Sequence, residues 1–549
     1  MDVKTLKFEA QQRYKDLEDN PIAFFCAEYA FDEDSSMYAG GLGVLAGDFI
    51  LESAEEGLPF VGIGLWYGGP RSPIRAKEFS LLEQDGSPVL VEVLCGEDNI
   101  KARIWARHFG KSTWLLLLDT NFSENKEQNQ SISEHLYDPD FQARIRQEML
   151  LGVGGVKLLQ SLGLKPSIYH LNEGHTAFAG LELIAEEAKR LGTTDAALAL
   201  NSVKKKIVAT KHTILAVAGG GISEDEFNKL VQPYCEKNNI SVSDVFKLGE
   251  HTEIKKVFST TQFLLNCAER QNGVSILHTA SEKKVHPQST LFPITNGIYD
   301  KRWQAEAWHK EKDPLFNDKE IWSIRKNLRE RLVNFVNERT RAELDPNVCT
   351  IVWARRFAKY KRPELLFSNL ERLKSICSNK LKVQFIISGK AHESDPIGQK
   401  MVEKIKSVTK DNDFKNKIVY INDYSISIAT ELVLGADVWL NTPERGFEAC
   451  GTSGMKAGLN GALQASISDG WIDEVDWSDT GFILKEGDTA KLLYDTLEKE
   501  IIPLFYDRDR SGLPVEWIRR VRETQKIVES GFTTKRMLND YLTKAYKVL

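Results

Sequence analysis

The sequence predicts an α/β protein built from two doubly wound, Rossmann-like domains that face each other across a central cleft. Two observations predict this class: short apolar segments alternate with segments of helical periodicity, and a Pro- and Gly-containing segment at residues 286–298 separates two such series. The 549 residues are 42% hydrophobic and 27% charged, which is typical of globular proteins and excludes disordered and fibrous classes. A chain of this length allows two large domains or three to four smaller ones.

The first half, residues 1–292, is predicted to be one α/β domain with insertions. Residues 22–27 (IAFFCA) and 60–67 (FVGIGLWY) are apolar strands separated by a glycine-rich loop and a helix. An antiparallel β insertion is expected near residues 83–119, because three apolar runs are separated by short turn sequences. Further on, a helix is expected at 142–163, strands at 168–171 and 207–210, and another helix after Asn172.

The second half, residues 293–549, alternates more regularly. The predicted strands are TIVWAR, VQFIIS, IVYI, ADVWL and LQASI, and the helical stretches between them begin near Arg362, Asp395, Ser425 and Gly454. This alternation predicts a parallel, doubly wound sheet, with the segment 286–298 as the hinge and with final helices that could return to the first domain.

Charge, hydropathy and cysteine content exclude several kinds of protein. With 72 Lys and Arg against 78 Asp and Glu, the net charge is −6, so nucleic acid is not expected as a partner. No transmembrane helix is expected, because the longest uncharged stretch, 285–299, contains two prolines. The first 20 residues lack the apolar core of a signal peptide, which predicts a cytoplasmic protein. The seven scattered cysteines predict reduced, mostly buried thiols and no metal site.

Three motifs could bind anions at the carboxyl ends of the predicted strands. In residues 38–48 (YAGGLGVLAGD), closely spaced glycines would let a phosphate approach backbone N–H groups, although tight strand-to-helix packing explains them as well. Residues 354–362 (ARRFAKYKR) place five cations within eight positions, so either a fixed anion offsets their repulsion or they form a basic surface loop.

The third motif is GFEACGTSGMKAGLNGA, residues 446–462. It places Lys456 near the start of a predicted helix, where the helix dipole disfavours a cation. A Schiff base with a phosphate-bearing aldehyde would neutralise this lysine; an ordinary solvated lysine is the alternative.

Together and in this order, the motifs resemble the glycogen (α-glucan) phosphorylase family, which consists of pyridoxal-phosphate glycosyltransferases of the GT-B fold. The segments that carry the resemblance are AEYAFDEDSSMYAGGLGVLAGD, RIRQEMLLGVGGVKLL, YHLNEGHTAF, TKHTILA, ITNGIYDKRW, VWARRFAKYKR, ISGKAHESDPIGQ and EACGTSGMKAGLNGA. The chain looks like a short form that lacks the N-terminal regulatory segment of the animal enzymes.

The resemblance implies a role for individual positions of this chain. Lys456 would bind pyridoxal 5′-phosphate; the other cofactor-binding positions would be Thr452, Ser453, Arg355, Tyr424 and Trp303. The implied catalytic positions are Arg356 and Lys361, which would bind the substrate phosphate, and His212, whose backbone carbonyl would face the sugar. The implied substrate-binding positions are Gly41, Leu42, Asn296, Glu448, Cys450 and Gly451. Active-site positions of the family are also matched by Glu28, Glu173 and His175, for which a structural hydrogen-bonding role is expected.

The implied reaction is retaining phosphorolysis of an α-1,4-glucan, such as glycogen, starch or maltodextrin, by inorganic phosphate to give α-glucose 1-phosphate. The partners are then glucan and phosphate, with a homodimer as a further expectation. Cys450 replaces the usual serine, the segment after His212 lacks the expected prolines, and Glu444 and Gly446 replace the usual Arg and Pro, which leaves substrate choice open. The alternatives are a nucleotide-sugar glucosyltransferase similar to glycogen synthase and a catalytically silent glucan-binding protein.

Overall fold

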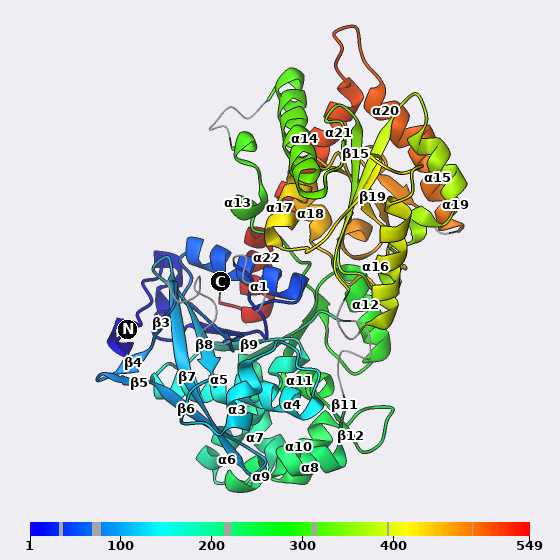
Figure 1. The fold of residues 1–549 in the computed structure, drawn as a ribbon. Coiled ribbons are helices and arrows are strands. Elements are labelled where there is room, and N and C mark those ends of the chain that lie inside the picture. The colour runs from blue at the N-terminus through cyan, green and yellow to red at the C-terminus, as the bar shows by residue number, and fades with distance from the viewer. Residues whose placement is uncertain are drawn as a thin grey trace. The chain divides into compact units, whose positions relative to one another are not determined.

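The chain forms two compact units in a computed structural model that describes residues 1–31, 37–68, 78–213, 221–309, 316–391, 395–485 and 487–548. Unit 1 contains residues 1–274, 279–294 and 538–549, and unit 2 contains residues 275–278 and 295–537 (Figure 1). Within the described residues, no helix is long and apolar enough to cross a membrane.

Unit 2 is built on a six-stranded parallel sheet. The strands in spatial order are β17 (Ile418–Ile421), β16 (Val383–Ser388), β15 (Cys349–Ala354), β18 (Val438–Asn441), β19 (Leu463–Ile467) and β20 (Phe482–Leu484). Counted along the chain this is the order 3-2-1-4-5-6, which is the order of a doubly wound dinucleotide-binding sheet. The parallel sheet predicted for the second half is therefore confirmed.

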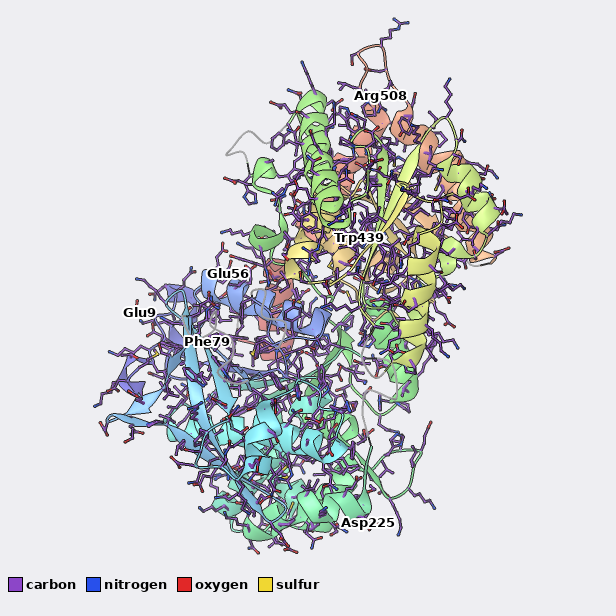
Figure 2. The ribbon with its side chains drawn as sticks, viewed as in Figure 1. Glu9, Glu56, Phe79, Asp225, Trp439 and Arg508 are labelled. Atoms are coloured by element: carbon purple, nitrogen blue, oxygen red, sulfur yellow. The ribbon has the colours of Figure 1, made fainter. Side chains whose placement is uncertain are left out.

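Strand burial explains why the sequence pattern was readable here. Every residue of β15, β16 and β19 is buried, as expected for a parallel sheet covered on both faces. Trp439 of β18 lies at the centre of the unit with 1% of its surface exposed (Figure 2). Figure 1 shows β15 and β19 between α14, α17 and α18 on one side and α15, α16 and α19 on the other.

The helices of unit 2 differ from the prediction at one place. Their bounds are α13 (Asp300–Trp303), α14 (Asp318–Thr340), α15 (Leu370–Cys377), α16 (Pro396–Thr409), α17 (Ile426–Gly435), α18 (Ser453–Leu459), α19 (Thr489–Thr496), α20 (Ile502–Tyr506) and α21 (Val515–Gly531). The helix predicted to begin near Arg362 is wrong, because α15 begins only at Leu370. Arg362 adopts a left-handed conformation (φ 44°), and its guanidinium donates to the carbonyl oxygens of Thr442 (3.0 Å) and Pro443 (2.7 Å). These tertiary hydrogen bonds hold the segment as a turn.

Unit 1 contains a ten-stranded mixed sheet. Along the main path the strands are β14 (Phe292–Pro293), β13 (Arg270–Gly273), β10 (Ile207–Lys211), β9 (Ile168–Asn172), β1 (Ile22–Phe25), β2 (Phe60–Leu65), β8 (Thr113–Asp119), β7 (Asp98–Phe109) and β3 (Ser80–Leu81), with β6 (Leu90–Cys95) on β7. The antiparallel pairing predicted near residues 83–119 is confirmed for β6, β7 and β8. However, β8 also pairs with β2 in parallel, so these strands extend the main sheet.

The helices of unit 1 alternate with its strands along much of the chain. They are α1 (Gly41–Glu55), α3 (Glu127–Gln130), α4 (Phe141–Met149), α5 (Gly155–Ser161), α6 (Phe178–Leu191), α7 (Ala196–Val203), α8 (Glu224–Leu230), α9 (Gln232–Lys237), α10 (Val242–Gly249) and α11 (Thr260–Cys267). Both α12 (Ile276–Val285) and α22 (Thr534–Asp540) cross the division between the units. Asp225, which is labelled in Figure 2, lies in the first turn of α8.

The end of the chain packs in unit 1. The Tyr546 hydroxyl lies 2.7 Å from Nδ1 of His170, and Arg270 donates to the carbonyl oxygen of Ala545 (2.6 Å). In Figure 1 the C-terminus is drawn beside α1. All seven cysteines are buried free thiols, which confirms that prediction.

Candidate functional site

The anion-binding motif predicted after β15 lies at the carboxyl edge of the unit 2 sheet. Arg355 directly follows β15, and its backbone N–H donates to the carbonyl oxygen of Ser388, the last residue of β16, at 3.1 Å. In open parallel sheets this edge is where ligands bind. The position of Arg355 is therefore set by the sheet itself.

Arg355 and Lys361 converge on the carboxylate of Glu448. Arg355 Nη2 lies 3.1 Å from Glu448 Oε2, and Lys361 Nζ lies 3.0 and 3.2 Å from the two carboxylate oxygens. All three side chains are buried. Burial alone would raise the pKa of Glu448, but the charges of Arg355 and Lys361, with Arg356 further away, outweigh burial and hold this pKa below its ordinary value.

This cluster carries two cations and one carboxylate, so it favours a further anion. Arg355 also donates through Nη1 to the side chain of Asn441, whereas its buried Nε has no hydrogen-bond partner among the described residues. Arg356 and Lys359 of the same motif are exposed. The two readings of the basic segment are thus both partly right: Glu448 is a fixed counter-ion for two cations, and two others face solvent.

The loop that carries Glu448 is held by hydrogen bonds to the carboxylate of Asp469. Its Oδ2 atom accepts from the backbone N–H groups of Gly446 (2.9 Å) and Glu448 (3.0 Å). Burial raises the pKa of Asp469 to about 6, although backbone hydrogen bonds act against this shift. A Cβ atom at Gly451 would lie 2.8 Å from Glu448 Oε1 and 3.0 Å from Arg355 Nη2, so only glycine leaves the ion pair undisturbed.

Lys456 is the fourth of the seven residues of α18 and is buried. It therefore lies in the middle of a short helix and not in the first turn, so the helix-dipole argument made from the sequence was wrong. Its Nζ lies 3.8 Å from the ring centroid of Trp303, which ends α13. Thr452 and Ser453, at the start of α18, and Tyr424, in the loop between β17 and α17, are partly buried. The lysine is thus held against an aromatic face.

Asn296 and Cys450 contact each other next to this cluster. Asn296 Nδ2 donates to the carbonyl oxygen of Cys450 at 3.3 Å, while its buried Oδ1 has no partner among the described residues. Burial raises the pKa of the Cys450 thiol far above its ordinary value, so the thiol stays neutral. The backbone here is fixed further by Ser275, whose hydroxyl donates to the carbonyl oxygen of Ala449 at 2.6 Å.

The glycine-rich motif lies in unit 1, at the start of α1. Gly41 is its first residue and is exposed; Leu42 is partly buried. Glu28, which is buried, accepts through Oε2 from the backbone N–H groups of Ala39 (2.8 Å) and Gly40 (3.2 Å). Residues 32–36, within the motif segment that carries the resemblance, lie outside the described residues. Glu28 thus shapes the loop before the helix.

His212 also lies in unit 1, directly after β10. Its backbone N–H donates to Glu173 Oε2 (2.8 Å), and its Nε2 lies 2.7 Å from Asn172 Oδ1. Burial opposes ionisation of Glu173, but Lys211, His212 and His175 outweigh it and lower its pKa to about 2. Burial also lowers the pKa of His212 to about 4, so the imidazole is neutral near pH 7. The departure noted after His-Thr, at residues 214–220, lies outside the described residues.

Three residues that hold the site were not found in the sequence. These are Asn441, Asp469 and Asn460. Asn441 directly follows the predicted strand ADVWL, Asp469 lies two residues after LQASI, and both could have been proposed for that reason. Asn460 lies four residues after Lys456, which on a helix places both on one face.

Comparisons with known proteins show the family of the chain. The family model described as carbohydrate phosphorylase matches residues 305–477, which include Arg355, Lys361, Glu448 and Lys456. A glycogen phosphorylase of Aquifex aeolicus is 33% identical to this chain, over 97% of the chain and 87% of that protein. A maltodextrin phosphorylase of Thermococcus litoralis is 32% identical, over 96% of the chain and 70% of that protein, and a glycogen phosphorylase of Mycobacterium tuberculosis is 31% identical over the same shares. Such identity over nearly the whole chain means that this protein belongs to the carbohydrate phosphorylase family.

Proposed function

We propose that the protein is an α-1,4-glucan phosphorylase, which transfers the terminal glucosyl unit of a glucan to inorganic phosphate with retention and releases α-glucose 1-phosphate. The observation that carries the proposal is the buried cluster of Arg355 and Lys361 around Glu448, next to the helix that bears Lys456. The similarity of the chain to glycogen and maltodextrin phosphorylases supports the same reaction class.

The residues present fit pyridoxal 5′-phosphate as the cofactor. Lys456 offers a buried amine for its aldehyde, with Trp303 beside it. Tyr424 is proposed from the resemblance as a further neighbour of the cofactor ring. Arg355, whose Nε has no partner among the described residues, would hold the cofactor phosphate together with the Thr452 and Ser453 hydroxyls. When bound, the cofactor supplies a phosphate group that serves as acid/base partner of the substrate phosphate.

In this proposal the substrate phosphate is bound by Arg356 and Lys361. Two phosphates close together repel strongly unless cations surround them, and Arg355, Arg356 and Lys361 supply three positive charges. In unit 1, the resemblance to the family supports the backbone N–H groups of Gly41 and Leu42, at the start of α1, as further phosphate donors. The phosphate oxygen can then serve both as nucleophile and as counter-ion of the positively charged glucosyl group in the transition state.

The glucosyl pocket is proposed from a third set of residues, which lie in unit 2: Asn296, Glu448, Cys450 and Gly451. For His212, in unit 1, the resemblance to the family supports a sugar-facing backbone carbonyl. Asn296 Oδ1 is a buried acceptor without a partner among the described residues, so a sugar hydroxyl could donate to it. Glu448 is held ionised and can accept from hydroxyl groups. A pocket of this kind should reject sugars that lack these hydroxyls, because its own polar groups would remain unpaired.

We further propose that the two units are the two domains of a GT-B fold, with Rossmann-like sheets. A cytoplasmic location and a homodimer remain predictions of the sequence.

The proposal is tested by incubating the purified protein with phosphate and several α-glucans while glucose 1-phosphate is measured. In the reverse direction, transfer to maltoheptaose should be faster from glucose 1-phosphate than from ADP-glucose or UDP-glucose. Faster transfer from a nucleotide sugar would favour the synthase-like alternative, and glucan binding without any transfer would favour the silent one.

The cofactor assignment has its own test. After treatment with borohydride, mass spectrometry should find one pyridoxyl group, attached to Lys456. A pyridoxyl group on another lysine, or none, would contradict the assignment, and Lys456→Ala should abolish both cofactor retention and activity.

A further inference from the structure

We propose that Asn460 is a positioning residue that fixes the ring of Trp303 against Lys456 and thereby sets how tightly the cofactor is retained and how accessible the lysine is. This inference rests on the proposed function for its cofactor part. Its structural part concerns the ligand-free chain and stands independently.

The side-chain amide of Asn460 joins the two short helices that carry the pair. Its Nδ2 donates to the carbonyl oxygens of Trp303 (2.7 Å) and Lys456 (2.9 Å), and its Oδ1 accepts from the backbone N–H of Ala305 (2.8 Å). Asn460 is completely buried. All three hydrogen bonds of the amide are therefore made with backbone atoms: one with Trp303 of α13, one with Ala305 just after it, and one with Lys456 of α18.

The backbone of Asn460 is fixed in turn. Arg325, also completely buried, donates through Nη1 to the Asn460 carbonyl oxygen at 2.7 Å. The next residue, Gly461, has φ 88°, and a Cβ there would lie 2.8 Å from Val521 and 3.0 Å from Arg325. The end of α18 is thus anchored to α14 and α21, so Asn460 can transmit a fixed position to α13.

The arrangement has a direct consequence for Trp303. Only four residues form α13, which is too short to be stable by itself. With Asn460 removed, the Trp303 carbonyl and the Ala305 N–H lose their buried partner, and the 3.8 Å contact between Nζ and ring is no longer enforced. A desolvated cation over an indole ring is stabilised enough that its loss changes an equilibrium constant about 3- to 30-fold.

The test is a double-mutant cycle on the full-length protein with Asn460→Ala, Trp303→Leu and the double variant. The first readout is the rate at which bound pyridoxal 5′-phosphate is lost, and the second is the rate at which trinitrobenzenesulfonate labels Lys456 in cofactor-free protein, followed by peptide mass spectrometry. The matched control is Gln525→Leu, because Gln525 is a buried amide that donates to the carbonyl oxygen of Leu459 (3.1 Å), the residue before Asn460, and among the described residues it has no hydrogen bond to α13. Thermal unfolding of every variant is measured in parallel, and Asn460→Ser replaces Asn460→Ala if the latter does not fold.

Each single variant should increase both rates about 3- to 30-fold. The rates of the double variant should not exceed those of Trp303→Leu. Gln525→Leu should leave both rates within about twofold of those of the unaltered protein, at a similar loss of thermal stability. Additive effects, or an equal effect of Gln525→Leu, would show that Asn460 is merely structural and would overturn the inference. If the unaltered protein retains no pyridoxal 5′-phosphate, the proposed function fails, while the labelling rates alone still decide the role of Asn460.

Discussion

Unit 2 contains two clusters with the same charges, each with two cations around one carboxylate, but the surroundings of the two clusters differ. In the first, Asp437 lies 2.8 Å from Arg329 and 3.6 Å from Arg325, and all three are almost completely buried. In the second, Glu448 lies between Arg355 and Lys361. Charge composition alone therefore does not separate a structural cluster from a proposed binding site.

The difference lies in the position along β15 and in the remaining partners. Asp437 precedes β18 and accepts from the backbone N–H of Thr350, near the start of β15, while Arg325 donates to several backbone carbonyl oxygens. Arg355 directly follows the end of β15, and Glu448 lies in the loop between β18 and α18. The first cluster is thus closed by backbone acceptors, whereas the second lies at the edge where parallel sheets bind ligands and contains Arg355 Nε, which has no partner among the described residues.

The largest expected effect is on stability, from Asp437→Asn. Because both arginines would remain buried with no compensating charge, unfolding free energy should fall by about 3–5 kcal/mol. Denaturant unfolding of the intact chain, followed by tryptophan fluorescence, measures it. Asp413→Asn is the control, since its ion pair with Lys374 is half exposed and should contribute less than about 1 kcal/mol. A similarly small loss for Asp437→Asn would remove the distinction between the clusters.

The second effect is on activity, from Lys361→Ala and Arg356→Ala. Each would remove a proposed charge-assisted contact to phosphate, worth about 1.5–3 kcal/mol of transition-state stabilisation. The kcat/KM for phosphate should therefore fall roughly 10- to 150-fold, with the cofactor retained. Arg355→Ala should instead loosen the cofactor. Exposed Lys359 of the same motif provides the control variant, Lys359→Ala. Unchanged phosphate dependence in both variants would refute their roles.

A third effect concerns anion binding when the carboxylate of the second cluster is neutralised by Glu448→Gln. The uncharged isostere frees Arg355 and Lys361 for an external anion, so sulfate should bind about tenfold more tightly, roughly 1.4 kcal/mol, as measured by calorimetry without glucan. Glucan should bind more weakly, because an acceptor of sugar hydroxyls is weakened. The control is Glu444→Gln, which alters an exposed carboxylate of the same loop. Weaker sulfate binding in Glu448→Gln would contradict this account.

The smallest effect is the acid dependence of the second cluster. The folded pKa of Glu448 is below its ordinary value, so this group stabilises the fold above its unfolded pKa, and the contribution disappears as pH falls through the lower, folded value. Glu448→Gln should therefore lose less stability than the unaltered protein between pH 5 and pH 3. Denaturant midpoints across this range measure it, and parallel pH profiles would exclude the ion pair as a contributor.

Much of the fold was predictable because local signals agreed with the tertiary environment. The strands β16 and β19 match the predicted VQFIIS and LQASI, because fully buried parallel strands are continuous apolar runs. The strand β17 matches IVYI, with only Tyr420 partly exposed. The start of α16 was predictable from Asp395, which caps it through a hydrogen bond to Gly398 N (2.9 Å). Where tertiary contacts decide the backbone, as at Arg362, local pattern predicted a helix that does not form.

The sequence by itself determined the family and the parallel sheet of the second half, and it supplied the candidate site residues, since apolar periodicity and motif order are local properties of the chain. Only the tertiary structure decided that Glu448 pairs with Arg355 and Lys361 from 87 or more residues away, and that Trp303 covers Lys456. Such pairings depend on which loops follow neighbouring strands of one sheet. Strand order is fixed by packing of the whole unit, and no short segment of the chain contains it.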